Sequence, residues 1–259
     1  MIHIIGAGSG AVDLITVRGA RLLAEADTVV YAGSLVNPEI LTTYTKPACQ
    51  MYDSARMTLE EVLEVLLTAE RAGKHAVRLH TGDPCLYGAI REQMDALNAA
   101  GASYEVVPGV SSFCGAAAAL HAEYTLPGVS QSVIITRMAG RTPVPEKENL
   151  AGLASHGATM VIFLSASYLD ALREQLLEGG YQKDTPAAIV YKATWPDEKV
   201  VRGTVDTLPR MAAENNITKT ALILVGGFLE GAYARSKLYA PDFSHGYRTA
   251  KSGEERHAD

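Results

Sequence analysis

The chain has 259 residues and a formal net charge of −6, and it is 47% hydrophobic and 20% charged. These values are typical of a globular protein long enough to bury one large core or two smaller ones. The acidic balance argues against non-specific nucleic-acid binding, which depends on clustered Lys and Arg. No apolar run approaches the roughly 20 residues that cross a bilayer, so we expect no membrane span.

The cysteines and histidines indicate no metal centre and no disulfide framework. Cys49, Cys85 and Cys114 are far apart and form no Cys-x-x-Cys pair. The seven histidines show no metal-ligand spacing, so we expect no protein-bound metal. No signal peptide precedes the first predicted strand, and we therefore expect a cytoplasmic protein.

Strands alternate with helices over the first half of the chain. Strands are predicted at 2–5, 28–32, 76–79 and 104–107, and helices at 13–26, 58–72, 89–100 and 111–121. Thr58 followed by Glu61 fits a capping box at the start of one helix, and Gly73 ends it. This alternation predicts a parallel α/β sheet.

A second set of elements follows a Leu-Pro-Gly linker at 126–128. Strands are predicted at 132–136, 159–164, 187–191 and 221–225, an antiparallel hairpin partner at 199–205, and helices at 146–155, 167–178 and 206–214. We therefore predict two α/β domains, 1–122 and 123–240, and a polar tail at 241–259.

A glycine-rich loop follows the first predicted strand. Gly6, Gly8 and Ala11 match a dinucleotide-binding fingerprint, in which glycines let a ligand approach the backbone. Such a site also needs an acidic residue at the end of the second strand to hold the ribose hydroxyls. That strand ends in Tyr31 and Ala32, without an acid. A nicotinamide-dependent oxidoreductase and a non-catalytic nucleotide-binding module are therefore kept only as alternatives.

Two further loops follow predicted strands: Gly82-Asp83-Pro84, and Pro108-Gly109-Val110 with two serines after it. Open α/β sheets bind ligands at the carboxyl ends of their strands, which favours a ligand site here. Each loop also has a purely structural interpretation, as an Asx turn at Asp83 and as a helix N-cap at Ser111 or Ser112. The residues alone leave both interpretations open.

In their order and spacing, these segments resemble the tetrapyrrole methylase family. The resemblance extends over nearly the whole chain, through residues 6–10, 31–36, 81–84, 107–109, 125–131, 136–137, 140–143 and 191–196. The segments at 31–36, 140–143 and 192–196 are similar to members that methylate C-11 of precorrin-4 or cobalt-precorrin-4 in cobalamin biosynthesis. Another methylase of that pathway is the alternative. Ser9 departs from the family, whose members commonly have Pro there.

The resemblance implies S-adenosylmethionine as the cofactor, bound in a cleft between two α/β domains of a homodimer. It implies cofactor contacts by Gly82, Asp83, Leu86, Ser111, Ser112, Leu164, Ala193 and Ala221. The tetrapyrrole substrate carries many carboxylates, so the cations beside these motifs are candidate substrate contacts: Arg78, Arg137, Arg141 and Lys192. Solvated surface charge is the alternative for each. No catalytic residue is assigned, because the attacking ring carbon is already nucleophilic.

Overall fold

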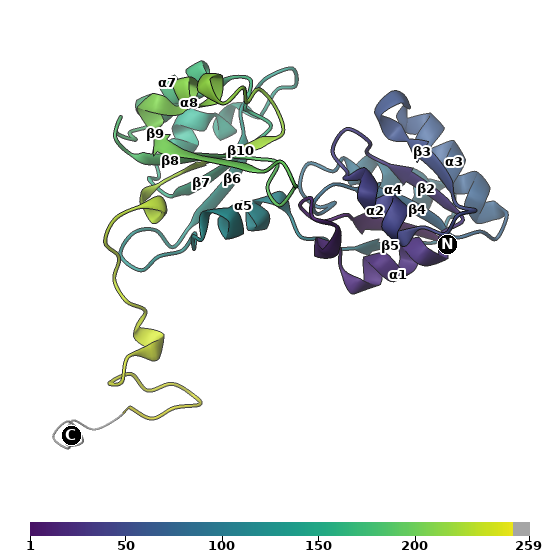
Figure 1. Ribbon diagram of the computed structural model, residues 1–259, viewed down its shortest axis with the longest axis horizontal. Coiled ribbons are helices and arrows are strands. Elements are labelled where there is room, and N and C mark those ends of the chain that lie inside the picture. Colours follow the sequence, from purple (N-terminus) through teal and green to yellow (C-terminus); the bar gives the residue numbers. More distant parts are fainter. Residues whose placement is uncertain (251–259) are drawn as a thin grey trace.

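The computed structural model describes residues 1–250, which form two α/β units in succession (Figure 1). The first unit has a five-stranded sheet in the order β3-β2-β4-β1-β5, and all its pairings are parallel. Its strands are β1 (Ile2–Gly6), β2 (Thr28–Tyr31), β3 (Gln50–Asp53), β4 (Ala76–His80) and β5 (Tyr104–Val107). The predicted parallel sheet is thus confirmed.

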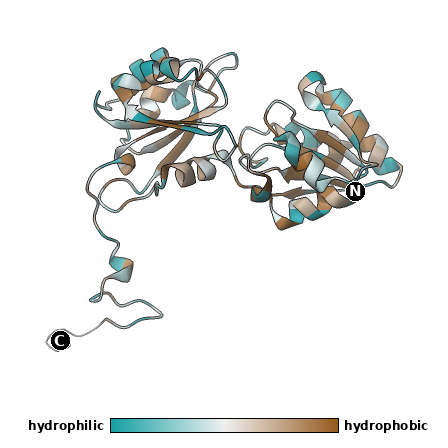
Figure 2. Cartoon of the chain, in the orientation of Figure 1, coloured by the Kyte–Doolittle hydropathy of each residue, from teal (hydrophilic) through white to brown (hydrophobic). Residues whose placement is uncertain are grey.

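Helices cover both faces of the first sheet and enclose two cores. The helices are α1 (Val17–Glu25) and α2 (Pro38–Tyr44) on one face, and α3 (Leu59–Arg71) and α4 (Ile90–Ala99) on the other. Ile4 and Ile5, neighbours in β1, lie in different cores because successive strand side chains point to opposite faces. Figure 2 shows the resulting pattern, with hydrophobic strands and helices that alternate hydrophobic and hydrophilic residues.

The second unit has a mixed five-stranded sheet in the order β6-β7-β10-β8-β9. Its strands are β6 (Val133–Arg137), β7 (Thr159–Phe163), β8 (Pro186–Tyr191), β9 (Lys199–Thr204) and β10 (Ala221–Val225). The β6–β7 pair is parallel and the other three pairs are antiparallel. The predicted hairpin partner at 199–205 is confirmed as β9, which pairs with β8 along its whole length.

Helices also cover both faces of the second sheet. One face carries α6 (Leu150–Ala154), α7 (Leu169–Glu178) and α8 (Leu208–Glu214). The other face carries α5 (Ser112–Leu120), whose Ala116 and Leu120 pack with Val161 and Val190 (Figure 1). The predicted boundary at residue 122 follows this helix, whereas the hydrophobic core already changes before it. By its packing, α5 belongs to the second unit.

Several predicted helices are shorter in the structure. The helix predicted from residue 13 begins at Val17, because Ile15 and Thr16 are extended and the Thr16 hydroxyl accepts a hydrogen bond from the Gly19 amide at 3.1 Å. The helices predicted at 146–155 and 206–214 each divide into a 3₁₀ turn and a shorter α-helix.

Neither α2 nor β3 is among the elements predicted from the sequence, although the residues before and in the first turn of α2 are typical of a helix start. Asn37 caps α2 and Pro38 occupies its first turn. The capping box at α3 is confirmed, since the Glu61 amide donates to the Thr58 hydroxyl at 3.3 Å and the Thr58 amide donates to Glu61 Oε2 at 2.7 Å.

After β10, Phe228 still packs in the core of the second unit and the Ala234 amide donates to the Pro127 carbonyl at 3.0 Å, and beyond this point the chain extends away (Figure 1). The segment contains a 3₁₀ turn, Lys237–Tyr239, and Arg248 Nη2 donates to the carbonyls of Leu238 and Ala240 at 2.8 and 2.7 Å. Residues 251–259 of the predicted polar tail lie outside the described residues. Over residues 1–250, no helix is long and apolar enough to cross a membrane.

The two units meet where the glycine loop, residues 6–11, contacts the tryptophan loop, residues 192–198. The Ser9 and Thr194 hydroxyls are 3.0 Å apart, and the Ala11 amide donates to Thr194 Oγ1 at 3.0 Å. Gly10 has φ +154°, and any Cβ on it would overlap the indole ring of Trp195. The glycine is therefore required by the close approach of the two units.

We predict that Gly10→Ala destabilises the protein more than Gly101→Ala, measured by chemical denaturation. Gly101 also has a positive φ, +67°, but a Cβ there meets nothing within 4 Å. Gly101→Ala should therefore cost only the strain of a left-handed residue, about 1–2 kcal/mol. Gly10→Ala should cost about 1–3 kcal/mol more, because the Trp195 ring must move. Equal losses would mean that the Gly10–Trp195 contact does not stabilise the junction.

Candidate functional site

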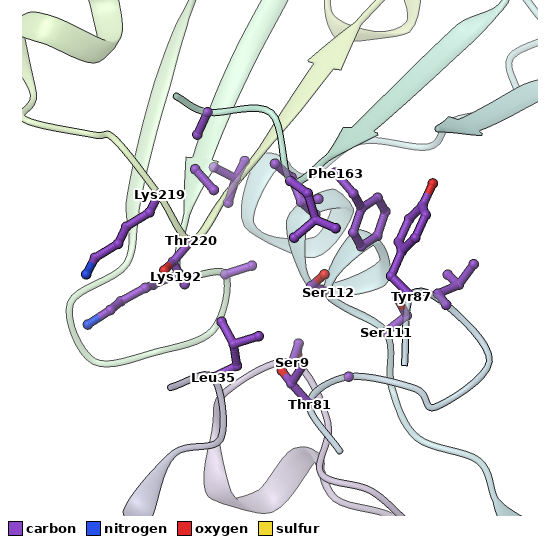
Figure 3. A pocket seen from close by; sticks show the side chains of 18 of the residues that line it. Ser9, Leu35, Thr81, Tyr87, Ser111, Ser112, Phe163, Lys192, Lys219 and Thr220 are labelled. Atoms are coloured by element: carbon purple, nitrogen blue, oxygen red, sulfur yellow. The ribbon is translucent and has the colours of Figure 1, made fainter. Parts of the chain in front are cut away.

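A cavity of about 290 Å³ lies between the two units (Figure 3). This volume is close to the lower end of small-molecule sites, roughly 300–1,000 Å³. The first unit contributes Ser9, Leu35, Thr81, Gly82, Asp83, Leu86 and Tyr87, and the second contributes Ser111, Ser112, Phe163, Leu164, Ala166, Ser167, Val190, Lys192, Ala193, Trp195, Thr218, Lys219, Thr220, Ala221 and Leu222. The walls are therefore made mainly by loops at the ends of strands from both sheets.

All eight residues that the family resemblance implies as cofactor contacts line this cavity. They are Gly82, Asp83, Leu86, Ser111, Ser112, Leu164, Ala193 and Ala221. They come from segments after β4, β5, β7 and β8 and from the start of β10. Residues far apart in the sequence thus share one concave surface.

Asp83 connects the two ligand loops. Its Oδ1 accepts a hydrogen bond from the Cys85 amide at 2.8 Å, which forms the Asx turn of the structural interpretation. Its Oδ2 accepts one from the Gly109 amide at 2.9 Å. Partial burial by itself raises the pKa of Asp83, but the hydrogen bonds from Cys85 and Gly109 outweigh it and hold the pKa below its ordinary value. Asp83 therefore both shapes the loops and lines the cavity.

The two serines after β5 present hydroxyls to the cavity. Ser111 occupies the N-cap position of α5, yet its side chain makes no capping hydrogen bond. Ser111 is buried and Ser112 half-buried, and both line the cavity (Figure 3). The N-cap interpretation does not account for these side chains, which leaves both hydroxyls available to a ligand.

Backbone strain is concentrated around the cavity. Four non-glycine lining residues have positive φ: Tyr87 (+55°), Leu164 (+53°), Lys192 (+47°) and Thr220 (+53°). Such conformations cost on the order of 1–3 kcal/mol each and persist where surrounding contacts impose them, often at functional sites. One such contact is the hydrogen bond from the Lys192 amide to the Thr220 carbonyl at 2.9 Å.

Of the four predicted substrate cations, Lys192 lines the cavity. Its Nζ donates to Asp197 Oδ2 at 2.7 Å and lies 5.4 and 5.1 Å from the ring centroids of Tyr191 and Trp195. The hydrogen bond to Asp197 raises the pKa of Lys192, so the amine stays charged.

The interpretation of Arg78 as a substrate contact needs correction. Arg78 is only 7% exposed and does not line the cavity. Its Nε donates to Gln93 Oε1 and its Nη1 to the Val30 carbonyl, both at 3.2 Å. Burial lowers its pKa to about 10, which still leaves it charged at neutral pH. Arg78 is a buried structural cation of the first unit.

Arg137 and Arg141 do not line the cavity either. The Arg137 guanidinium donates to the carbonyls of Met138 and Thr142 at 3.1 and 3.2 Å and of Pro143 at 2.7 Å, so it holds the loop after β6 in shape. Arg141 is exposed on that loop.

Some cavity residues are absent from the sequence-based candidates. Ser9, Leu35, Tyr87 and Trp195 all stand within or beside the motif segments, so proximity to a motif could have indicated them. Lys219 lies in a turn before β10 that carries no motif, and only the fold brings it to the cavity. In the described part of the chain, no three His, Cys, Asp or Glu residues gather to hold a metal ion.

Comparisons with known proteins agree with this geometry. The family described as tetrapyrrole (corrin/porphyrin) methylases matches residues 1–209. Cobalt-precorrin-4 C(11)-methyltransferase of Methanocaldococcus jannaschii is 52% identical over 248 residues, which cover 95% of each chain. The solved structure of a cobalamin biosynthetic enzyme, cobalt precorrin-4 methyltransferase, has a TM-score of 0.86 at 48% identity and covers 89% of this chain and 96% of that one.

A more distant structure contains a bound ligand. Uroporphyrin-III C-methyl transferase from Thermus thermophilus, solved with S-adenosylhomocysteine, has a TM-score of 0.73 at 26% identity. The superposition covers 88% of this chain and 93% of that one. The two-unit architecture is therefore shared with that ligand-binding enzyme.

We predict that Asp83→Asn lowers the free energy of unfolding by about 1–3 kcal/mol at neutral pH, because one of the two backbone amides loses its acceptor. The pKa of Asp83 is lowered in the folded state, so its contribution is complete above the ordinary value of about 3.9 and is lost as the pH falls through the lower, folded value. The difference in free energy of unfolding between wild type and Asp83→Asn should therefore shrink below about pH 4.

Urea denaturation at several pH values measures this difference. Asp184→Asn is the matched control, because Asp184 is exposed and accepts no side-chain hydrogen bond from any residue the structure describes. If the difference in free energy of unfolding between wild type and Asp83→Asn grew toward acid pH, the stabilising role of the ionised Asp83 carboxylate would be contradicted.

Proposed function

Because the chain belongs to the tetrapyrrole methylase family, we propose that it transfers a methyl group from S-adenosylmethionine to C-11 of precorrin-4 or of its cobalt complex in cobalamin biosynthesis. The observation that carries this proposal is the 52% identity, over nearly the full length of both chains, to a relative named for that reaction. A solved structure named for the same substrate supports it at 48% identity.

The cavity fits S-adenosylmethionine, which supplies a methyl group activated by the sulfonium. Leu86, Leu164 and Ala193 provide apolar walls, and Ser111 and Ser112 provide free hydroxyls. These are the surfaces that an adenosyl group and an amino-acid end require. We propose that all eight residues predicted from the resemblance contact this cofactor.

The arrangement of charges in the cavity favours transfer over tight ground-state binding. Asp83 is the one carboxylate among the lining residues described, and backbone amides hold both its oxygens. An anion pressed onto the sulfonium would stabilise the charge that must leave sulfur during transfer, and would slow the step. Asp83 therefore contacts the cofactor away from the methyl group.

The protein's main contribution is then to hold the reacting atoms in line. Alignment of two reactants can lower a barrier by roughly 7–11 kcal/mol. The strained loops that carry Leu164 and Lys192 are held by the fold before the ligands arrive. A general base is not required, because the ring carbon is already nucleophilic.

Lys192 is the one of the four predicted cations that we retain as a substrate contact, because it is the one that lines the cavity. We favour the cobalt complex as substrate, since the names of the curated relative and of the solved structure both carry it. We further propose a cytoplasmic homodimer, as the family resemblance implies.

The structure gives a reason to disfavour the dinucleotide alternative. The glycine loop, which would hold a pyrophosphate, is filled by the protein itself: Trp195 lies against Gly10, and Asn37 Nδ2 donates to the Gly10 carbonyl at 2.9 Å. A 3₁₀ turn, Val12–Leu14, follows this loop directly, and the first α-helix, α1, begins only at Val17. Gly10 therefore serves the contact between units, whereas Gly6 and Gly8 lie against the backbone of Gly82, Gly109 and Leu14.

We predict that S-adenosylhomocysteine binds one site per chain and that NADH does not bind. Titration calorimetry with the two ligands under identical conditions measures this. Tight NADH binding without a response to S-adenosylhomocysteine would contradict the cofactor assignment.

We predict that the methyl group arrives at C-11. The purified protein is incubated with carbon-13-methyl S-adenosylmethionine and, separately, with precorrin-4, cobalt-precorrin-4 and uroporphyrinogen III, and NMR identifies the labelled carbon. Label on uroporphyrinogen III, or on another carbon of precorrin-4, would refute the C-11 assignment and leave the methyltransferase assignment standing.

A further inference from the structure

The cavity has two chemically different sides. Figure 3 shows Tyr87 and Phe163 on one side and Lys192 and Lys219 on the opposite side, with both amines directed away from the aromatic rings. The aromatic rings are 5.3 Å apart between centroids and tilted by 49°. One side of the cavity is therefore aromatic, and the opposite side carries two cations at its outer edge.

Tyr87 combines two features that a purely structural residue would avoid. Its φ of +55° is rare for a bulky side chain, and the side chain remains 45% exposed. Leu164, from the other unit, repeats the combination with φ +53° and 62% exposure. Apart from the Tyr87–Phe163 contact, a strained backbone that holds large apolar groups in solvent gains little in the free protein. It does present an apolar surface to a ligand.

The Tyr87 hydroxyl adds a polar tip to this surface. Partial burial raises the pKa of Tyr87 and outweighs the opposing effect of the Arg137 charge, so the hydroxyl stays protonated at neutral pH. The contact of Tyr87 with Phe163 joins the first unit to the second at the edge of the cavity.

Lys219 supplies the cationic side with a charge that no acid of the described chain neutralises. Its amine makes no ion pair or hydrogen bond within residues 1–250, whereas Lys192 is paired with Asp197. The two lysines belong to adjacent loops, joined by the hydrogen bond from the Lys192 amide to the Thr220 carbonyl. An anionic group at this side of the cavity would meet Lys219 first.

We propose that the tetrapyrrole binds with its macrocycle against Tyr87 and with a peripheral carboxylate on Lys219. This inference rests on the proposed function, because it assumes a tetrapyrrole substrate. The match is in shape and charge: a flat apolar ring system with carboxylate arms meets an aromatic side and a cationic side. Tyr87 and Lys219 thereby set which ring carbon faces the cofactor.

Steady-state kinetics with cobalt-precorrin-4 and S-adenosylmethionine varied separately tests this. Tyr87→Ala should raise the KM for the tetrapyrrole about two- to tenfold, whereas Tyr87→Phe should stay within about twofold of wild type, because the ring makes the contact. Lys219→Gln should raise that KM by a similar factor, Lys219→Arg should restore it, and added salt should reduce the difference. The affinity for S-adenosylhomocysteine should be unchanged in all four variants.

Lys183→Gln is the matched control, because it removes one exposed lysine of the same unit that does not line the cavity. Unchanged S-adenosylhomocysteine binding also shows that each variant is folded. Unchanged tetrapyrrole KM in Tyr87→Ala or in Lys219→Gln would overturn the two-sided orientation, as would an equal loss of S-adenosylhomocysteine affinity. Failure of the wild-type protein to methylate any tetrapyrrole would instead refute the proposed function.

Discussion

The contact between Gly10 and Trp195 is the constraint on which the cavity depends. Two α/β units, each with its own sheet and cores, meet through the glycine loop and the tryptophan loop. Thr194 binds both Ser9 and the Ala11 amide, and the next residue places its indole ring where Gly10 has no side chain. Because Ser9 and Trp195 also line the cavity, the same contact fixes the distance between its walls.

This contact changes the meaning of the glycine motif. In the sequence, the glycines after β1 match a loop that lets a phosphate approach the backbone. In the structure, backbone atoms of Gly82, Gly109 and Leu14 lie against Gly6 and Gly8, and the Trp195 ring of the second unit lies against Gly10. The loops that line the cavity are the neighbouring ones, where Asp83 and Ser111 follow β4 and β5, and we propose that they bind the ligand. A motif read alone could not distinguish these uses, since both need the same missing side chain.

How far the sequence predicts the structure depends on the range of the interactions. Local signals are reliable: the Thr58–Glu61 capping box and the β8–β9 hairpin follow from neighbouring residues. The candidate cofactor residues could be carried over from the family segments, and all of them line the cavity. Arg78 shows what a motif cannot predict. Its position beside a motif gives no sign that its guanidinium donates hydrogen bonds to Gln93 and to the Val30 carbonyl. Lys219 is the opposite case: no motif surrounds it in the sequence, and contacts between distant segments bring its turn to the cavity.

The central claim is that the cavity between the two units is the cofactor site. A crystal structure of the protein with S-adenosylhomocysteine tests it most directly. The account predicts ligand density in this cavity, in contact with the loops that carry Asp83, Ser111 and Ala193. Ligand density at the glycine loop outside the cavity, or on one unit alone, would contradict it.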